Sequence, residues 1–357
     1  MGAKNPLTIE VTRGSMVESR HRGHAVVMDA DGKVLHAWGD ARKVIYPRSS
    51  IKPLQALVLI ETGAADAYGL AERELALASA SHGATPEHTD LCAHWLERIG
   101  LGPGDLECGG QEPMDAETAR DLIRMGVPPG PIHNNCSGKH TGFLTTARHL
   151  GEPVAGYSGP DHPVQQRLAA MLAEMGDCDL TDAPTGMDGC GIPVYGMPLR
   201  AMATALARMA DPAGLAPERR AAAKRIIGAM TAHPRLVAGP GRFDTLAMEA
   251  GAMEAGANTF AVKGGAEGMY GAILPGLGLG IALKIDDGAK RASEVAMAAI
   301  LEFLGVLAPM ETGAAETAMA AFMEAPVTNA RGEAVGAVRM AEGWEPSTAL
   351  KSEAGDR

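Results

Sequence analysis

The sequence predicts an α+β fold, in which helices flank one mixed or antiparallel sheet and a helical middle is inserted as a second lobe. Segments with the apolar pattern of strands gather near the two ends of the chain, at 7–38 and 259–285. The middle carries Ala, Leu and Met at helical spacing instead. Strands from the two ends most simply meet in one sheet. We therefore expect a sheet domain at 1–60 and 255–345, a mainly helical lobe at 61–254 and a frayed tail at 346–357.

The composition indicates a globular protein that acts on a small molecule. Of its 357 residues, 32 are basic and 43 acidic, which gives a formal net charge of −11. Nucleic-acid and anionic-membrane surfaces need basic patches, so we expect no nucleic-acid partner and no membrane. The five cysteines are an odd number and widely spaced, which favours reduced thiols in the cytoplasm. Residues 1–6 show no apolar segment of the kind found in secretory signals.

The N-terminal part is expected to form strands and then a helix. Alternating apolar residues predict four strands, at 7–13, 15–20, 24–28 and 34–38. The pair Asp31-Gly32 suits the positive φ of a tight turn and predicts a hairpin between the last two strands. Apolar residues on one face predict a helix over 49–61, which Gly63 would end.

The middle is expected to be helical until strands return near 259. Ser137 could cap a helix that runs to Leu150 and ends at Gly151. Further helices are predicted at 163–175, 199–210 and 216–232. The last part predicts strands at 259–263, 270–274 and 280–285, helices at 290–304 and 315–323, and a strand or hairpin at 335–340.

A serine stands three residues before a lysine in the segment 46–53. Residues three apart on a helix share a face, so Ser49 Oγ and Lys52 Nζ could come within proton-transfer distance. A serine becomes a nucleophile when a neighbouring base takes its proton, and a lysine is such a base if burial or positive charge lowers its pKa. The alternative without function is a serine N-cap beside a solvated lysine.

Two more polar clusters follow along the chain. Ser81 and His82 come after an Ala/Leu helix, where a hydroxyl and a capping His would also explain them. Lys263 ends a strand before Gly264, where a bulge with an exposed lysine is the alternative. The three clusters occur in the order of Ser-x-x-Lys, Ser-x-Asn and Lys-Thr-Gly in serine β-lactamases. The missing Asn and the Gly264 in place of Thr argue against a β-lactam or peptidoglycan substrate.

A fourth cluster is foreign to β-lactamases. Cys136, Lys139 and His140 lie within five residues of one another at a loop–helix junction, and Cys190 lies between two glycines. Two thiolates and a nitrogen ligand suit tetrahedral zinc. The spacing is not that of a zinc finger or ribbon, and two buried, inert cysteines are the alternative.

The chain resembles the class 3 L-asparaginases, the asparaginase II family of bacteria. The motifs that carry the resemblance extend over nearly the whole length, at 17–21, 48–53, 78–82, 134–142, 188–193, 241–245 and 263–268. The resemblance implies a fold like that of serine β-lactamases and penicillin-binding proteins, a cytoplasmic homodimer, and hydrolysis of L-asparagine to L-aspartate and ammonia.

The resemblance also implies roles for particular residues. It implies two Ser–Lys tandems, Ser49 with Lys52 and Ser81 with Lys263, as the catalytic groups. It implies a zinc site at Cys136, Lys139 and Cys190. Asparagine brings a carboxylate and an ammonium group that need partners when buried. Arg48 and His140 are candidates for the carboxylate, and Asp188 for the ammonium group.

These residues predict acyl transfer in two steps. Lys52, kept neutral by the positive charges of Lys263, Arg48 and Lys139, would accept the Ser49 proton while Ser49 attacks the side-chain amide. Ser81 would relay a proton to the leaving ammonia, and zinc would orient the substrate. The alternatives are a glutaminase or another serine hydrolase of small amides, a hydrolase with a zinc-activated water, and a non-catalytic amino-acid-binding sensor.

Overall fold

The computed structural model describes residues 6–253, 259–307 and 314–346, which form two compact units. Unit 1 consists of Met1–Ser50, Met197–Asp211 and Leu246–Arg357. Unit 2 consists of Ile51–Gly196 and Pro212–Thr245. The predicted frayed tail at 346–357 lies outside the described residues except for residue 346. No helix in the described part of the chain is both long and apolar enough to cross a membrane.

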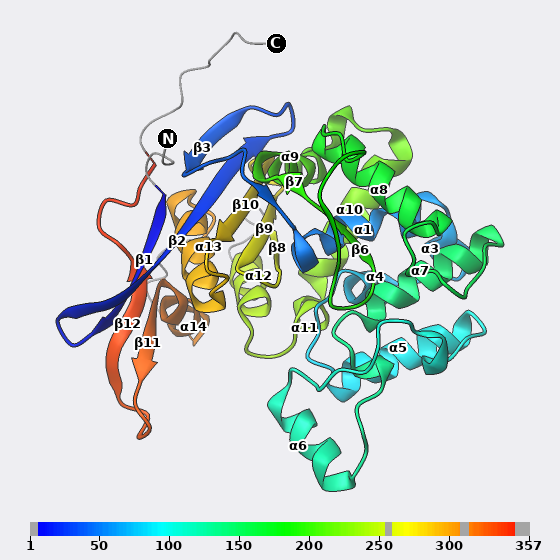
Figure 1. Cartoon of the computed structure of the whole chain (residues 1–357), viewed down its shortest axis with the longest axis horizontal. Helices are drawn as coiled ribbons and strands as arrows, with labels where there is room; N and C mark the ends of the chain where they lie inside the picture. The colour runs from blue at the N-terminus through cyan, green and yellow to red at the C-terminus, as the bar shows by residue number, and fades with distance from the viewer. Residues whose placement is uncertain (1–5, 254–258, 308–313, 347–357) are drawn as a thin grey trace. The chain divides into compact units, whose positions relative to one another are not determined.

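The main sheet of unit 1 has eight strands in the described chain, and all of them pair antiparallel (Figure 1). Its order is β11-β12-β1-β2-β10-β9-β8, and β3 also pairs with β2. The strands are β1 (Leu7–Arg13), β2 (Met16–Asp29), β3 (Val34–Trp38), β8 (Ala261–Gly264), β9 (Met269–Leu274), β10 (Leu279–Ile285), β11 (Glu324–Thr328) and β12 (Ala334–Met340). Strands from both ends of the chain therefore meet in one antiparallel sheet, and the predicted α+β class is confirmed.

Strand β2 corrects the prediction of separate strands at 15–20 and 24–28. It is one strand of 14 residues, whose first half is mostly exposed and whose second half is buried. The first half pairs with β1, and the second half pairs with β10 and β3. The change from polar to apolar residues marks the point where the strand enters the covered part of the sheet, rather than a break in the strand.

Helices cover the sheet of unit 1. Helix α9 (Leu199–Ala210) packs against β10, β2 and β9, and α13 (Lys290–Phe303) packs against β12, β9, β10 and β1. Successive residues of β10 point to opposite faces of the sheet, yet Ile281, Ala282 and Leu283 are all fully buried. Both faces are thus covered at the centre of the sheet. The remaining elements are β4 (Val44–Ile45), which pairs with β7 (Met197–Pro198), and α14 (Ala314–Met323).

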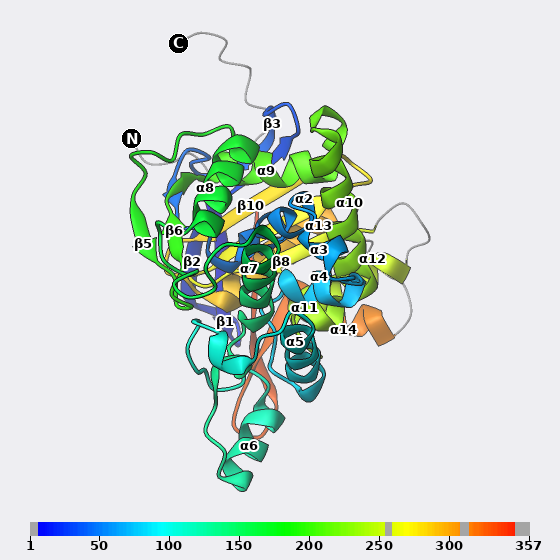
Figure 2. The ribbon, with the colours of Figure 1, turned by 90° about the vertical axis from the view of Figure 1, so that its right-hand side faces the viewer.

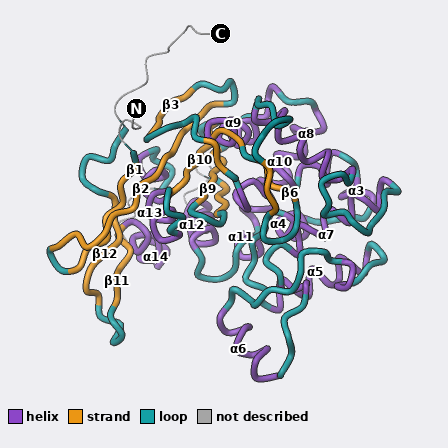
Figure 3. Tube along the Cα trace, in the orientation of Figure 1, coloured by secondary structure: helices purple, strands orange, loops and turns teal. Residues whose placement is uncertain are grey.

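Unit 2 is mainly helical, with one short hairpin of β5 (Thr185–Met187) and β6 (Pro193–Tyr195). Helix α7 packs against α2, α3, α4, α5 and α8, and Figure 2 shows it among them. Helix α6 projects from this unit between two loop segments (Figure 3). The helices are α1 (Lys52–Gln55), α2 (Leu57–Glu61), α3 (Ala64–Ala67), α4 (Glu72–Ala78), α5 (Pro86–Arg98), α6 (Ala116–Met125), α7 (Ser137–Leu150), α8 (Pro163–Gly176), α10 (Pro217–Ala232) and α11 (Pro234–Val237), while α12 (Phe243–Met253) contains the boundary between the units.

The predicted helix over 49–61 is interrupted in the structure. It consists of a 3₁₀ turn at Arg48–Ile51, then α1, then α2 after Ala56. Proline cannot donate a backbone hydrogen bond and clashes with the carbonyl four residues earlier, so Pro53 must lie in the first turn of an α-helix. Helix α1 accordingly begins at Lys52. Gly63, at a φ of +77°, follows α2 as predicted.

The two units differ from the predicted domains in three segments, one of which is 246–253, expected in the helical lobe but part of unit 1. Helix α9 was expected in the helical lobe but belongs to unit 1, because its small residues pack onto β10, β2 and β9. Residues 51–60 were expected in the sheet domain but belong to unit 2, because α2 packs against α7 and α10. Helical periodicity predicts a helix but not the surface on which the helix packs.

Replacing Gly280 by Ala should destabilise the protein by about 3 kcal/mol. A Cβ at this position of β10 would lie 2.3 Å from the carbonyl oxygen of Ala203 and from the backbone nitrogen of Ala207, which are rigid parts of α9. Urea unfolding followed by circular dichroism measures the change. Gly228→Ala is the matched control, because a Cβ in that α10 position meets nothing within 4 Å and should stabilise the helix by about 1 kcal/mol at most. Equal stabilities of the two variants would contradict the close packing of α9 on β10.

Candidate functional site

In unit 1, Ser49 lies in a 3₁₀ turn that begins at Arg48. Arg48 has a φ of +52°, which is uncommon for a residue with a side chain and occurs often at functional sites. Ser49 itself is half-buried. The end of β8 passes this turn closely, since a Cβ on Gly265 would lie 3.1 Å from the nitrogen of Ser50 and 3.2 Å from the oxygen of Pro47. Because Gly265 has no side chain, the chain at the end of β8 can approach the turn that carries Ser49.

Lys263 is buried in β8, with 2% of its surface exposed. Its ammonium group donates a hydrogen bond to the carbonyl oxygen of Gly264 at 2.7 Å. The alternative of an exposed lysine at a bulge is therefore wrong. Unit 1 brings together the Ser49 turn and the strand of Lys263.

In unit 2, Lys52 is also buried, with 1% of its surface exposed, so the alternative of a solvated lysine is wrong. Its Nζ donates hydrogen bonds to Ser81 Oγ at 3.0 Å and to the carbonyl oxygen of Ala80. The boundary between the units lies between Ser49 and Lys52. The predicted pairs Ser49–Lys52 and Ser81–Lys263 each join residues of different units and stay predictions.

The pKa of Lys52 is lowered, as predicted. Burial is the largest cause, because it disfavours the charged form of the lysine. Lys139 lowers the pKa further, while Cys136 and Cys190 act in the opposite direction. The sequence allowed burial or positive charge as the cause, and the predicted mechanism named the charges of Lys263, Arg48 and Lys139, of which Lys139 acts on Lys52 within unit 2.

Two segments of unit 2 that are far apart in sequence, one at His82 and one at 135–138, lie against each other beside Lys52. The backbone nitrogen of His82 donates to the carbonyl oxygen of Asn135 at 3.2 Å. His82 Nδ1 accepts a hydrogen bond from the nitrogen of Ala84, so its Nε2 carries the proton and donates to Ser137 Oγ at 2.9 Å. A Cβ on Gly138 would lie 2.4 Å from the oxygen of Leu77, so α7 and α4 touch backbone to backbone. The alternative of a capping His82 is wrong, because this His is fully buried and joins the two segments.

Helix α7 begins and ends where the sequence predicted, but its cap differs. Cys136 rather than Ser137 is the N-cap residue, and its side chain makes no capping hydrogen bond. The side chain of Asn134 instead accepts a hydrogen bond from the nitrogen of Cys136 at 2.9 Å and fixes the loop there. Ser137 lies inside the first turn of α7. Its hydroxyl does not cap the helix and instead accepts a hydrogen bond from His82 Nε2.

Cys136, Lys139 and Cys190 meet at the start of α7. Lys139 Nζ donates to Cys190 Sγ at 3.0 Å, and Cys136 Sγ donates to Asn135 Oδ1 at 3.0 Å. Interaction with Cys190 lowers the pKa of Cys136 well below its usual range, and Lys52 and Lys139 add to the effect. Burial alone would lower the pKa of Lys139, but Cys190 and Cys136 outweigh it and raise that pKa.

The donor atoms of this cluster suit zinc. Two cysteine sulfurs and a lysine nitrogen converge, and a thiolate is the form that binds the metal. No group of three His, Cys, Asp or Glu side chains in the described residues could hold a metal, so Lys139 would have to supply the third ligand. Its ammonium group would lose a proton on binding.

The three candidates for substrate binding divide between the units. Arg48 belongs to unit 1, and His140 and Asp188 belong to unit 2. Asp188 is half-buried in the turn before Cys190 and is one of the groups that raise the pKa of Lys139. His140 is fully buried, and burial lowers its pKa well below the usual value, so it is neutral.

The structure also shows residues that sequence reasoning missed. Arg242 Nη1 donates to the carbonyl oxygen of Ser81 at 2.6 Å and to that of Ala238 at 3.3 Å, which fixes the backbone of Ser81. Arg242 lies in one of the resemblance motifs, and that was the available signal. The hydroxyl of Tyr157 lies 2.7 Å from Nδ1 of His140, and no pattern around Tyr157 in the sequence pointed to it.

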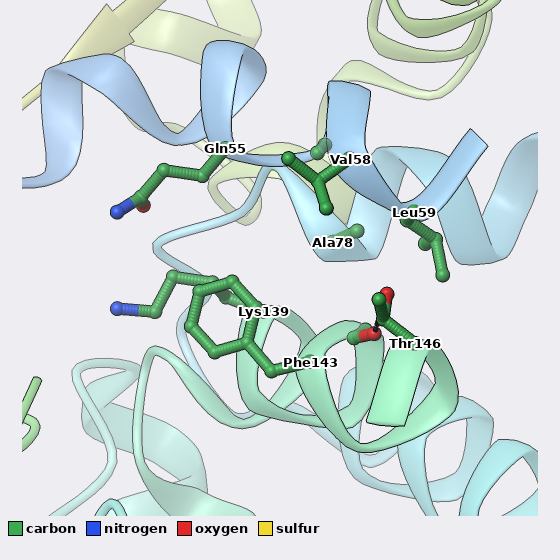
Figure 4. Close-up of a pocket in the computed structure, with 9 residues that line it drawn as sticks. Gln55, Val58, Leu59, Ala78, Lys139, Phe143 and Thr146 are labelled. Carbon is green, nitrogen blue, oxygen red and sulfur yellow. Dashed lines mark hydrogen bonds between the residues drawn. The ribbon is translucent and has the colours of Figure 1, made fainter. Parts of the chain in front are cut away.

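A small cavity of unit 2 lies beside Lys139 (Figure 4). Its walls are mostly apolar and include Val58, Leu59 and Phe143. Its volume of about 10 Å³ holds one water molecule at most, so it is no substrate pocket. The aliphatic part of Lys139 passes beside Phe143, whose ring centre lies 5.6 Å from Nζ. The apolar residues around the cavity therefore pack against the aliphatic part of the Lys139 side chain, while its Nζ donates a hydrogen bond to Cys190.

Among solved structures, three similar ones share little sequence with this chain. A putative β-lactamase from Bacteroides dorei is 16% identical, with 74% of this chain and 84% of that chain covered and a TM-score of 0.38. Simvastatin synthase from Aspergillus terreus is 11% identical, with 74% and 87% covered and a TM-score of 0.35. D-alanine carboxypeptidase from Burkholderia cenocepacia is 14% identical, with 75% and 88% covered and a TM-score of 0.35.

Comparison with protein families gives a more direct result. No curated protein matches the chain. A family model described as L-asparaginase II matches residues 9–340. Because this match extends over most of the chain, the protein belongs to the L-asparaginase II family of amidohydrolases.

Proposed function

We propose that this protein hydrolyses L-asparagine to L-aspartate and ammonia. Membership of the L-asparaginase II family supports the reaction. The observation that carries the chemistry is the buried Lys52, whose Nζ lies 3.0 Å from the hydroxyl of Ser81. Burial lowers the pKa of Lys52, which favours its action as the base that a serine hydrolase needs and a binding protein does not.

In the proposed first step, Ser49 attacks the side-chain amide carbon of asparagine while Lys52 accepts the hydroxyl proton. Ser49 stands three residues before Lys52, and the half-buried position of Ser49 is suited to contact with a substrate. Backbone N–H groups would hold the oxygen that gains negative charge. The carbon–nitrogen bond then breaks, the amide nitrogen takes up a proton and leaves as ammonia, and an aspartyl ester remains on Ser49.

Ser81 is proposed to relay the proton. Its hydrogen bond with Lys52 supports a path from the lysine to the leaving nitrogen through the Ser81 hydroxyl. Arg242 holds the Ser81 carbonyl, so the serine is fixed at its backbone as well as at its side chain. In the second step water attacks the ester by the reverse route, with its proton passing to Lys52, and Ser49 is restored.

Charges on the substrate need opposite charges or donors in the protein. Arg48 and His140 are the proposed partners of the α-carboxylate, and Asp188 is that of the ammonium group. Cys136, Lys139 and Cys190 would hold zinc, whose positive charge would help to orient the substrate when the metal is bound. The expected homodimer and cytoplasmic location stay predictions.

The direct test measures ammonia released from L-asparagine and from L-glutamine, with and without added zinc. The proposal expects release from asparagine at a kcat/KM at least about tenfold above that for glutamine, because one extra methylene shifts the amide relative to fixed catalytic groups. Faster release from glutamine would make the protein a glutaminase. Binding of asparagine without any ammonia would make it a sensor.

Ser49→Ala should lower kcat by about 10³-fold or more, because it removes the nucleophile. Ser81→Ala should lower kcat by about 10²-fold, as expected for loss of a proton relay. Mass spectrometry of the quenched reaction should detect an aspartyl adduct on Ser49. Ser79→Ala is the matched control, since the Ser79 hydroxyl bonds to the Leu75 carbonyl within α4 and should leave activity within about twofold. An adduct on Ser81 in place of Ser49 would reverse the two roles.

Cys190→Ser should abolish tight zinc binding, because the cluster offers two sulfurs and one nitrogen and would lose one sulfur. Equilibrium dialysis with zinc measures the metal bound per chain, independently of activity. Cys178→Ser is the control, since Cys178 is half-buried elsewhere in unit 2 and should leave binding unchanged. Undiminished zinc binding by Cys190→Ser would rule out the proposed ligand set.

A further inference from the structure

His140 has one buried nitrogen without a partner. The ring is fully buried between the rings of Phe143 and Tyr157, at centroid distances of 5.8 and 5.4 Å. Nδ1 lies 2.7 Å from the hydroxyl of Tyr157, whereas Nε2 makes no hydrogen bond to any described residue. Buried polar atoms are nearly always paired, and an unpaired one at the start of α7, next to Lys139, indicates a place that a ligand completes.

The hydrogen bonds of Tyr157 determine which nitrogen of His140 carries the proton. The backbone nitrogen of Glu107 donates to the Tyr157 oxygen at 2.9 Å, and a backbone N–H has no other role than donor. The phenol proton is then available for His140 Nδ1, which accepts it, so the neutral ring has its proton at Nε2. The opposite tautomer would leave both the phenol proton and Nε2 without partners, which is less favourable than one unpaired group.

The surroundings indicate the charge of the group that Nε2–H would meet. Of the charged groups that act on the His140 ring, Lys139 acts most strongly, and its raised pKa keeps it a cation. A neutral N–H donor beside an ammonium group suits an anion. The α-carboxylate is the anionic group of L-asparagine.

We propose that Tyr157 is a positioning residue, which holds His140 as an Nε2–H donor for the α-carboxylate of the substrate. This inference rests on the proposed function, because that function supplies the substrate. It goes further in naming the residue that orients His140 and the ring nitrogen that donates to the carboxylate. Glu107 takes part through its backbone nitrogen, since this group directs the phenol proton toward the ring.

The tautomer can be tested without any activity. In protein labelled with ¹⁵N at histidine, the ring nitrogens of His140 are assigned by comparison with His140→Gln. The wild type should show protonated Nε2 and unprotonated Nδ1, and Tyr157→Phe should lose this clear preference. Protonated Nδ1 in the wild type, or an unchanged pattern in Tyr157→Phe, would overturn the proposal. Tyr195→Phe is the control, because Tyr195 is a half-buried tyrosine elsewhere in unit 2 and its loss should leave the pattern intact.

Kinetics test the recognised group. Tyr157→Phe should raise the KM for asparagine about tenfold with kcat within about twofold, as expected for loss of one hydrogen bond to a charged group. The inhibition constant of L-aspartate, which keeps the carboxylate, should rise about equally, and that of 3-aminopropanamide, which lacks it, should not change. Equal changes for both inhibitors, or none for either, would overturn the recognition of the carboxylate.

Two further measurements separate this proposal from other failures. In a His140→Gln background, Tyr157→Phe should have little further effect on KM, because the orienting hydrogen bond no longer has a ring to act on. An undiminished effect there would mean that Tyr157 acts only on stability, and would overturn the positioning role. If the wild type releases no ammonia, the proposed function fails, while the tautomer and the binding of L-aspartate by calorimetry still test the inference.

Discussion

The burial of the Lys52 ammonium group is the constraint on which the arrangement of unit 2 depends. An ammonium group removed from water is unfavourable unless acceptors replace its hydration. The chain supplies these acceptors just beyond the end of α4, where the Ala80 carbonyl and the Ser81 hydroxyl meet Nζ. Carbonyl groups at the C-terminal end of a helix lack partners within it, so they are the natural acceptors for a cation. These two hydrogen bonds compensate for the burial of Lys52, and they also place Ser81 beside a lysine whose pKa is lowered.

A second set of contacts holds this lysine beside the thiol cluster. Gly138 lets the first turn of α7 touch α4 at Leu77, and His82 bonds to Asn135 and Ser137 in the same region. The ammonium groups of Lys52 and Lys139 therefore lie near the sulfurs of Cys136 and Cys190, and each charge changes the proton affinity of the others. Removing any one of these two lysines and two cysteines would leave a buried charge without its partner. The four side chains therefore stabilise one another as a group rather than in separate pairs.

The sequence predicted most of the strands and many of the long helices, because alternation and helical periodicity report which face of an element is buried, but it did not predict α5, α6, α12 or β11. The predictions were wrong where contacts between distant segments determine the extent or the place of an element. Residues 15–20 and 24–28 form one strand because the sheet continues past the covered region, and α9 joins unit 1 because it packs on β10. Among the site residues, the motifs pointed to lysines, serines and cysteines that the structure buries. Tyr157 could not be predicted, because its role depends on the backbone of Glu107, 50 residues away.

The hydrogen-bond donors of His82 and His140 are fixed in the same way, but the fold satisfies only one of them. In each ring Nδ1 accepts a hydrogen bond, from the Ala84 backbone in one and from the Tyr157 hydroxyl in the other, so each carries its proton at Nε2. His82 Nε2–H is satisfied by Ser137, and that ring links two segments of the fold. His140 Nε2–H has no such acceptor among the described residues, although the ring is equally buried. Burial makes both rings neutral, and only the unsatisfied one has a donor left for a substrate.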